Sequence, residues 1–345
     1  ETVNTGITIG GSPLVLTYDT ARQLTPLAFG DTPAFGRLWL SNLHRNLVVS
    51  TGAKTVHAYR GNGAVLSFML VNGVYVADTD INDQMQGISG GYLYTNATTQ
   101  SVETYNETGQ LINSVDATGR KLSFTYSNAA STIAPAAGYL TQVSDSDGRN
   151  IQFEYVLPAG GAALTDGKVS RVIDAYGRAT VPTYDANGNL TTISWTDDQT
   201  RQFLYENAAL PWALTGISDE RNIRYATFGY DVAGRAVSTE NADGTQRYSV
   251  TYGTPPQVLA TESLDLAARI HYHYYDWQLP TSPVITDPNN QAIDLTTTSA
   301  LGVPLLASAS QPAGSGCAAS NSASTFDASG NLISQDDFRG QRSCY

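Results

Sequence analysis

Charged side chains are scarce in this sequence. Of its 345 residues, 14% are Asp, Glu, Lys or Arg, against roughly a quarter in an ordinary soluble domain. Coiled coils and long solvent-exposed helices need dense Glu, Lys and Arg, so both are excluded. Hydrophobic residues still make up 41%, which argues against a disordered chain.

Basic residues are the scarcest charge. There are 19 Lys and Arg against 31 Asp and Glu, which gives a formal net charge of −12. An acidic surface repels phosphate, so we expect no nucleic acid as a partner. Among the basic residues the lysines are Lys54, Lys121 and Lys168 and the rest are arginines, a bias that suits fixed ion pairs better than a hydrated surface.

Long apolar runs and cysteine clusters are also missing. No run reaches the ~18 residues of a membrane-spanning helix. The residues after Glu1 carry no basic and then apolar leader, so we expect a signal peptide to have been removed or to lie outside this sequence. Cys317 and Cys344 are too few for a disulfide scaffold and lack zinc-site spacing.

What the sequence does contain is a short repeat. Each copy opens with an aromatic residue, Asp or Asn, two further residues and Gly. An alternating stretch, a second Asp-rich turn and another alternating stretch ending on Tyr follow. Full copies span residues 105–126, 184–205, 230–252 and 326–345, and half copies span 145–155, 174–184 and 219–230.

The repeat predicts one turn and one β-strand in every ten residues. In Asp-x-x-Gly the carboxylate accepts from backbone N–H groups two or three residues on, and Gly takes the positive φ. The turn residues expected from this pattern are Asp116, Gly119, Asp185, Gly188, Asp231, Gly234, Asp327 and Gly330. Leu122, Phe124 and Tyr126 then share one face of a strand. Helical periodicity is missing, so we predict an all-β chain.

A continuous meander of such strands has to curl. We therefore expect a curved, spiralling antiparallel sheet, which is an open segment of a shell. The alternative is a β-propeller or another β-repeat, because two copies of the repeat make one blade of about 42 residues.

The pattern divides the chain into two regions. Residues 1–100 contain strand-like runs without the turn signature, and residues 101–345 carry the repeat. Stretches rich in Ala, Gly, Ser or Pro near 127–137, 158–167 and 307–324 are expected to be loop insertions, since the repeat resumes after each.

The signature resembles that of the Rhs/YD-repeat family. It reads YDANGNL at 184–190, YDVAGRA at 230–236, FDASGNL at 326–332 and DATGRKLSFTY at 116–126. The resemblance covers about residues 103–345. The N-terminal stretch 13–42 is similar to the segment that opens Rhs shells, with Phe35-Gly36-Arg37-Leu38-Trp39 in place of its Gly-x-Gly-Trp-like element.

The resemblance implies a β-ribbon that spirals into a hollow shell around a C-terminal polypeptide, often a toxin. Bacterial polymorphic toxins, insecticidal toxin-complex shells and teneurins are similar in this respect. Many bacterial members carry paired Asp-Pro motifs that cleave the chain, whereas this sequence has the single Asp287-Pro288. It therefore looks like an N-terminal portion of a shell. Its implied partners are the remaining YD repeats and a C-terminal cargo, and its implied location is the cell surface or the bacterial extracytoplasmic space.

Cys317 and Cys344 flank one full copy of the repeat. A disulfide between them would stabilise the fold by about 3–4 kcal/mol in the chain-entropy model and would indicate an extracytoplasmic setting. The alternative is a pair of buried free thiols.

Two clusters suggest metal sites. The acidic segment 78–83 alternates oxygen ligands as calcium loops do, with Asp78, Asp80, Asn82 and Asp83 as the candidates. It lacks the central Gly of such loops, and a plain turn is the favoured alternative. His271 and His273, near Asp276, lie on one face of a strand and could bind zinc or act in acid–base chemistry. A structural role is favoured here too, and we expect no cofactor.

Exposed aromatic residues form the last candidate site. Trp212, Trp277, Tyr272 and Tyr274 could stack on a sugar or a peptide. For tyrosines at fixed repeat positions, packing between neighbouring strands is the favoured interpretation.

Three functions follow in order of preference. The first is a non-catalytic scaffold segment of a secreted Rhs/YD-repeat protein, which forms part of a β-shell around a toxin or effector. The second is a carbohydrate- or peptide-binding adhesin module, and the third is a polysaccharide-acting enzyme that uses His271 and His273. The sequence contains no complete catalytic motif, so we expect no enzyme activity.

Overall fold

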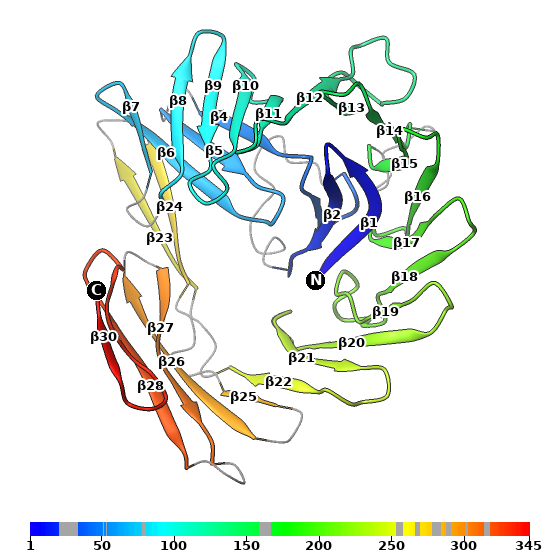
Figure 1. Ribbon diagram of the computed structural model, residues 1–345. Helices are drawn as coiled ribbons and strands as arrows, with labels where there is room; N and C mark the ends of the chain where they lie inside the picture. The colour runs from blue at the N-terminus through cyan, green and yellow to red at the C-terminus, as the bar shows by residue number, and fades with distance from the viewer. Residues whose placement is uncertain are drawn as a thin grey trace. The chain divides into compact units, whose positions relative to one another are not determined.

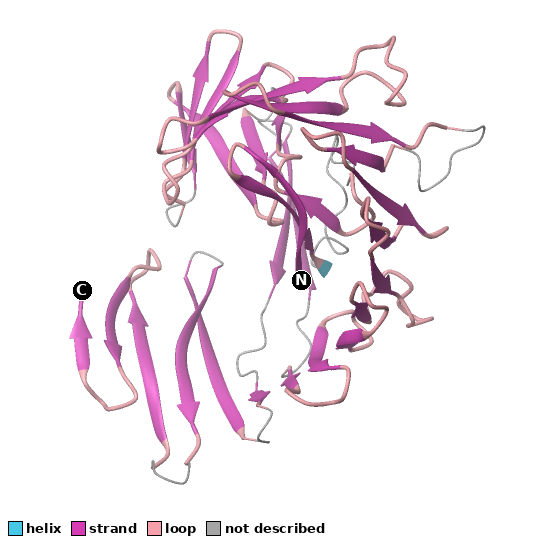
Figure 2. Ribbon diagram, turned by 45° about the vertical axis from the view of Figure 1, so that its right-hand side comes forward, coloured by secondary structure: helices cyan, strands magenta, loops and turns pink. Residues whose placement is uncertain are grey.

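The protein is all-β, as the repeat predicts. The computed structural model contains strands β1 to β30, and no α-helix occurs in the part of the chain that it describes (Figures 1 and 2). No described helix is therefore long and apolar enough to cross a membrane. The described residues are 1–20, 34–50, 52, 54–77, 81–158, 167–252, 258–265, 270–277, 284–287, 291–300, 303–313 and 318–345.

The chain forms two compact units, Glu1–Arg224 and Tyr225–Tyr345. This division differs from the one that the sequence pattern suggests at residue 100. The reason is packing: the N-terminal strands lie against repeat strands distant in sequence, so they belong to the same compact unit.

The first unit is built on one long antiparallel meander, in which each strand pairs with the next. No described ladder pairs β8 with β19, so the sheet of this unit is open, and it does not divide into separate propeller blades. Its strands are β8 (Gln84–Ile88), β9 (Gly91–Thr95), β10 (Val102–Asn106), β11 (Leu111–Val115), β12 (Lys121–Tyr126), β13 (Leu140–Asp145), β14 (Asn150–Tyr155), β15 (Val169–Ile173), β16 (Ala179–Tyr184), β17 (Leu190–Ser194), β18 (Thr200–Leu204) and β19 (Gly216–Ser218).

Two smaller sheets precede this meander. One has three strands, β1 (Thr2–Ile9), β2 (Ser12–Tyr18) and β3 (Trp39–Ser41), and the other has four, β4 (Asn46–Ser50), β5 (Thr55–Tyr59), β6 (Val65–Val71) and β7 (Val74–Ala77). The meander curves around the β1–β2–β3 sheet, which lies on its concave side (Figure 1).

Hydrogen bonds join the β1–β2–β3 sheet and the segment before β3 to the concave side. The indole Nε1 of Trp195 donates to the carbonyl of Thr5 at 2.7 Å. The Tyr18 hydroxyl donates to the carbonyl of Trp212 at 2.8 Å. In both cases a part-buried polar group finds a partner about 190 residues away in the chain, which fixes the inner sheet in place.

Trp39 anchors the core of the first unit. Its side chain is 1% exposed and meets the Phe203 ring edge-on, with centroids 4.8 Å apart. Its Nε1 donates to the Tyr205 hydroxyl at 2.9 Å. An aromatic residue of the N-terminal segment is thus buried against the repeat strands, where it removes a large apolar surface from water.

The Asp-x-x-Gly segments form the turns between strands. Asp116 Oδ1 accepts from the N–H groups of Thr118 at 2.8 Å and Arg120 at 3.0 Å. Gly119 has φ 86° and donates its own N–H to the Asp116 carbonyl at 2.9 Å. The carboxylate therefore bonds residues two and four positions on, because the backbone carbonyl takes the donor at position three. The pairs at 185/188, 231/234 and 327/330 share this geometry.

The repeat tyrosines hold each strand to the preceding one. The hydroxyls of Tyr126, Tyr155 and Tyr184 donate to the carbonyls of Leu111, Leu140 and Val169, at 3.0, 2.6 and 2.7 Å. Each acceptor lies 15 residues upstream. Each tyrosine also sits at a shift in the strand register, so the repeat places a β-bulge and its hydroxyl bond together.

The second unit is also built of antiparallel strands, of which β26 and β27 have nine residues each. It contains β20 (Arg224–Tyr230), β21 (Ala236–Asn241), β22 (Tyr248–Thr251), β25 (Val284–Thr286), β26 (Ala292–Ala300), β27 (Val303–Gln311), β28 (Ser320–Phe326), β29 (Leu332–Asp336) and β30 (Arg342–Cys344), with a separate hairpin of β23 (Val258–Asp265) and β24 (Ile270–Trp277).

The loop expected at 307–324 is shorter than the composition suggests. β27 continues to Gln311 and β28 begins at Ser320, with Ser308 opposite Ala323. Small Ser and Ala side chains fit a strand ladder as well as a loop, which is why composition misplaced the boundary. Residues 127–137 do lie between β12 and β13, and 159–166 lie outside the described residues.

Candidate functional site

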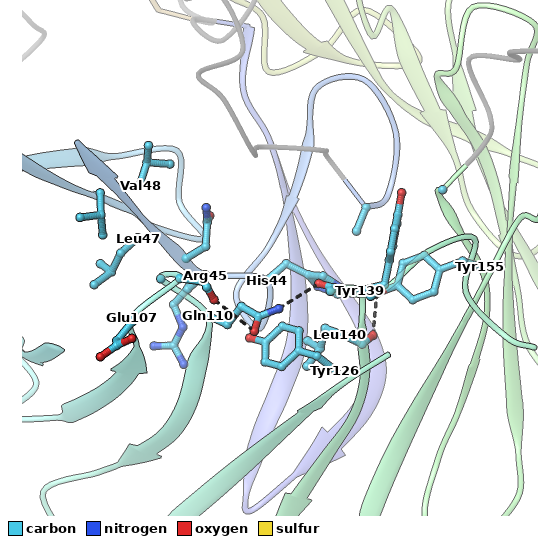
Figure 3. Close-up of a pocket in the computed structure, with 18 residues that line it drawn as sticks. His44, Arg45, Leu47, Val48, Glu107, Gln110, Tyr126, Tyr139, Leu140 and Tyr155 are labelled. Carbon is cyan, nitrogen blue, oxygen red and sulfur yellow. Dashed lines mark hydrogen bonds between the residues drawn. The ribbon is translucent and has the colours of Figure 1, made fainter. Parts of the chain in front are cut away.

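A cavity of about 600 Å³ opens between β4 and the repeat strands. In Figure 3 Leu47 and Val48 lie on one side, and Tyr126, Tyr139 and Tyr155 lie on the other. The volume falls within the ~300–1,000 Å³ range of ligand pockets. The remaining lining residues are Ala34, His44, Arg45, Asn46, Val49, Glu107, Thr108, Gly109, Gln110, Ala137, Gly138, Leu140 and Gly167.

One wall of the cavity is a sheet edge. β4 is the terminal strand of the β4–β5–β6–β7 sheet. The turn between β10 and β11 covers part of its outer edge, where Leu47 N–H donates to Gly109 C=O at 2.8 Å and Asn46 bridges to Gln110. A Cβ on Gly109 would lie 2.0 Å from the Leu47 oxygen, so this contact requires glycine.

His44 lines the cavity and contacts two aromatic rings. Phe35 and Phe153 meet its imidazole edge-on, with centroids 5.6 and 5.0 Å away. Nε2 lies 3.2 Å from the Tyr155 hydroxyl. That hydroxyl gives its proton to the Leu140 carbonyl, so it acts as an acceptor for His44. The imidazole therefore carries its hydrogen on Nε2.

Burial determines the charge of His44. Loss of solvent lowers its pKa to about 3, because a buried imidazole favours the neutral form. Nδ1 is left as a buried acceptor with no hydrogen-bond partner among the described residues. The ring is thus neutral at physiological pH, has no proton to donate at Nδ1 and serves a structural role.

A buried ion cluster fixes Arg45 beside the cavity. Glu103 is fully buried and pairs with both Arg45 and Arg60, the latter at 2.7 and 2.8 Å. Burial acts to raise the pKa of Glu103, but the two guanidinium groups and the Tyr105 hydroxyl hold it below its ordinary value. Arg60 also lies over the Tyr94 ring at 4.2 Å. The Glu103 carboxylate therefore has a structural role.

Asp83, from the predicted calcium segment, caps a turn. Its carboxylate accepts from Ala97 N–H at 2.7 Å, from Asn96 Nδ2 at 3.2 Å and from the Tyr94 hydroxyl. Asn82 is adjacent in the chain, and Asp78 and Asp80 lie outside the described residues. Within the described ranges, no three His, Cys, Asp or Glu side chains are grouped to hold a metal ion.

Of the two cysteines, Cys344 lies within the described residues. Cys344 is an exposed free thiol at the end of β30. Cys317 lies outside the described residues, so the disulfide stays a prediction.

The predicted aromatic platform is described in part. Trp212 is half-buried, and its carbonyl accepts the Tyr18 hydroxyl. Trp277, Tyr272 and Tyr274 belong to β24, together with His271, His273 and Asp276. The side chains of β24 lie outside what the structure describes, so the binding and zinc hypotheses there stay predictions.

The sequence did not indicate the cavity beside β4. Its residues come from an irregular segment, from a repeat turn and from repeat tyrosines, and no motif joins them. The nearest signal was the aromatic segment from Phe35 to Trp39, whose partners become visible only in the folded chain.

Comparisons with known proteins give matches among solved structures. No family model matches the sequence, and no curated protein sequence matches it. The crystal structure of TcdB2-TccC3-TEV superposes with a TM-score of 0.37 and 12% identity, over 94% of this chain and 19% of that chain. A Tc holotoxin pore from Photorhabdus luminescens gives 0.31 and 13%, over 94% and 20%.

A porin-like protein from Bacteroides uniformis is also similar, with a TM-score of 0.21 and 13% identity, over 77% of this chain and 93% of that one. These TM-scores are low, so the superpositions establish no shared function. The chain spans about a fifth of the length of the TcdB2-TccC3 chains that it matches.

Proposed function

We propose that this chain is a non-catalytic scaffold segment of a secreted Rhs/YD-repeat protein, and that its curved sheet forms part of a shell around a polypeptide. One observation carries the proposal. In the first unit the sheet already wraps polypeptide, since β1–β2–β3 lies on its concave side (Figure 1) and bonds to β17–β19 connections through Trp195 and Trp212.

The repeat supports this role because each copy adds a strand by the same local means. A turn aspartate caps backbone donors and a tyrosine hydroxyl binds the preceding strand. Such a sheet lengthens without a new core for every strand, which suits an enclosing wall. The partners we propose are further YD repeats and a C-terminal cargo of a longer polypeptide, in an extracytoplasmic setting.

Three of the described acidic groups also favour a scaffold over an enzyme. Glu103 is held by two arginines, Asp83 caps a turn, and Asp174 binds the N–H groups of Tyr176 and Arg178. A catalytic carboxylate needs access to substrate and a proton to exchange, whereas these are occupied by fixed donors.

A reporter experiment tests the enclosure. An unstructured polypeptide with tryptic sites is fused after Tyr345, and the same polypeptide is fused before Glu1 as the matched control. A wall that shelters downstream chain predicts several-fold slower cleavage of the reporter after Tyr345. Equal cleavage rates in the two fusions contradict the proposal.

A glycan array separates the scaffold from the adhesin. The scaffold predicts no glycan binding. Binding that is lost in Trp212→Ala or Trp277→Ala, with the fold intact by circular dichroism, would support the adhesin instead.

A further inference from the structure

We infer that the cavity beside β4 is a binding groove for an extended polypeptide strand, which pairs with the free edge of β4 at Val49 and places an apolar side chain against Tyr126 and Tyr139. The inference rests on the proposed function, since it gives the wrapped polypeptide a specific place to bind. It follows from the hydrogen-bond pattern of β4 and from the lining of the cavity.

The alternation of β4 exposes one backbone pair to the cavity. Leu47 lies opposite Ala58 in the β4–β5 ladder. Its backbone N–H nevertheless points away from β5, because it donates to the Gly109 carbonyl. In an antiparallel pair, residues two apart point their backbone groups to the same edge. The N–H and C=O of Val49 therefore face the outer edge too. Val49 lines the cavity, and no described strand pairs with β4 on this side.

The first half of this edge already binds polypeptide in the proposed manner. The β10–β11 turn lies along β4 at Asn46 and Leu47, through the Leu47–Gly109 bond and the Asn46–Gln110 bridge. A strand that enters the cavity would extend this row of backbone hydrogen bonds along β4 from Leu47 to Val49. Strand addition at an exposed sheet edge is a general mode of peptide recognition, in which main-chain bonds provide affinity and side-chain pockets provide selectivity.

The opposite wall favours an apolar side chain. The hydroxyls of Tyr126 and Tyr155 are directed to the carbonyls of Leu111 and Leu140, so their rings remain as the available surface. Tyr139 packs against Tyr155 with ring centroids 4.9 Å apart. Arg45 is paired with Glu103. The carboxylate of Glu107 also lines the cavity, so a segment with alternating apolar side chains fits this lining better than an acidic one.

The test uses the full chain and a phage-displayed library of random decapeptides. Peptides enriched on the chain are synthesised, and their affinities are measured by fluorescence polarisation. Ala137→Trp fills the cavity from its exposed rim, and Ala136→Trp is the matched control at an exposed position outside the lining. Val49→Pro removes the outward N–H, and Val49→Ala retains it.

We expect enriched peptides to lose at least tenfold in affinity on Ala137→Trp and none on Ala136→Trp. Val49→Pro should cost about fivefold, the value of one lost hydrogen bond, and Val49→Ala clearly less. In hydrogen exchange on the unaltered chain, the Val49 amide should exchange faster than that of Leu47 and slow when peptide binds. Failure to enrich any peptide, or affinities that Ala137→Trp leaves unchanged, would overturn the inference.

The two proposals fail separately. Peptide binding that depends on Ala137 and Val49, with equal cleavage of the two reporter fusions, supports the groove and removes the enclosing role. Protection of the reporter after Tyr345 without cavity-dependent peptide binding removes the groove and leaves the scaffold.

Discussion

Acid should destabilise the first unit through His44 before any carboxylate takes part. The neutral imidazole is buried against Phe35 and Phe153 and donates from Nε2 to Tyr155. Burial lowers its pKa to about 3 in the folded protein, whereas an exposed histidine in the unfolded chain titrates near pH ~6.5. The unfolded state therefore binds the proton more readily, and stability is lost as the pH falls below ~6.5.

The magnitude follows from the two pKa values. Each pH unit between them costs about 1.4 kcal/mol, so lowering the pH from 7 to 5 removes about 2 kcal/mol through His44 alone. The turn aspartates do not contribute in this window, because their pKa values are lowered below 3.8 and they stay ionised in both states. Burial also lowers the pKa of His57, so His57 acts in the same direction.

Urea unfolding at pH 7 and pH 5, followed by tryptophan fluorescence, measures this loss. Trp39, Trp195 and Trp212 lie in the first unit. His44→Gln should flatten the pH dependence by about 2 kcal/mol, and His57→Gln should have a smaller effect. A His44→Gln variant that loses as much stability between pH 7 and pH 5 as the unaltered chain would refute the assignment of a buried neutral imidazole.

Three further substitutions test the packing. Gly109→Ala should destabilise the protein by several kcal/mol, because the added Cβ meets the Leu47 oxygen. Gly119 has a similar φ and open space around it, so Gly119→Ala should cost only the ~1–2 kcal/mol of a left-handed residue. Equal melting temperatures of the two variants would contradict this. Tyr155→Phe should cost about 1–3 kcal/mol in denaturant unfolding, since it leaves the Leu140 carbonyl and His44 Nε2 without their partner. Tyr252→Phe should cost less, because the hydrogen bond of the Tyr252 hydroxyl is exposed. Glu103→Gln should cost about 3–5 kcal/mol, because two largely buried guanidinium groups lose their counter-charge. An unchanged urea midpoint would show that the cluster contributes nothing.

Most of the regular structure could be predicted because its causes are local. Asp116 and Gly119 lie within one turn, and Leu122, Phe124 and Tyr126 alternate along one strand. Such patterns specify strands, turns and antiparallel order from a ten-residue window. The same window misjudged 307–324, where small residues suit strand and loop alike.

Tyr126, Tyr155 and Tyr184, the tyrosines at the β-bulges, show what a local sequence pattern does not predict. The sequence predicted that they pack between strands, and the structure adds that each hydroxyl finds a carbonyl at a constant distance upstream. That partner depends on the loop length and register between two strands, which a residue pattern does not state. The compact division near residue 224 likewise depends on which strands the N-terminal segment covers, and a residue pattern does not state that.

The scarcity of charge now has a structural explanation. Turn aspartates, strand Thr and Ser, and tyrosines satisfy the backbone of an open antiparallel sheet without a high content of charged residues, and the sequence determined that much alone. Only the tertiary structure decided that β1–β2–β3 lies on the concave side, that His44 is neutral and that β4 keeps a free edge beside a cavity. These features join residues more than a hundred positions apart, and burial and free edges are properties of the packed chain.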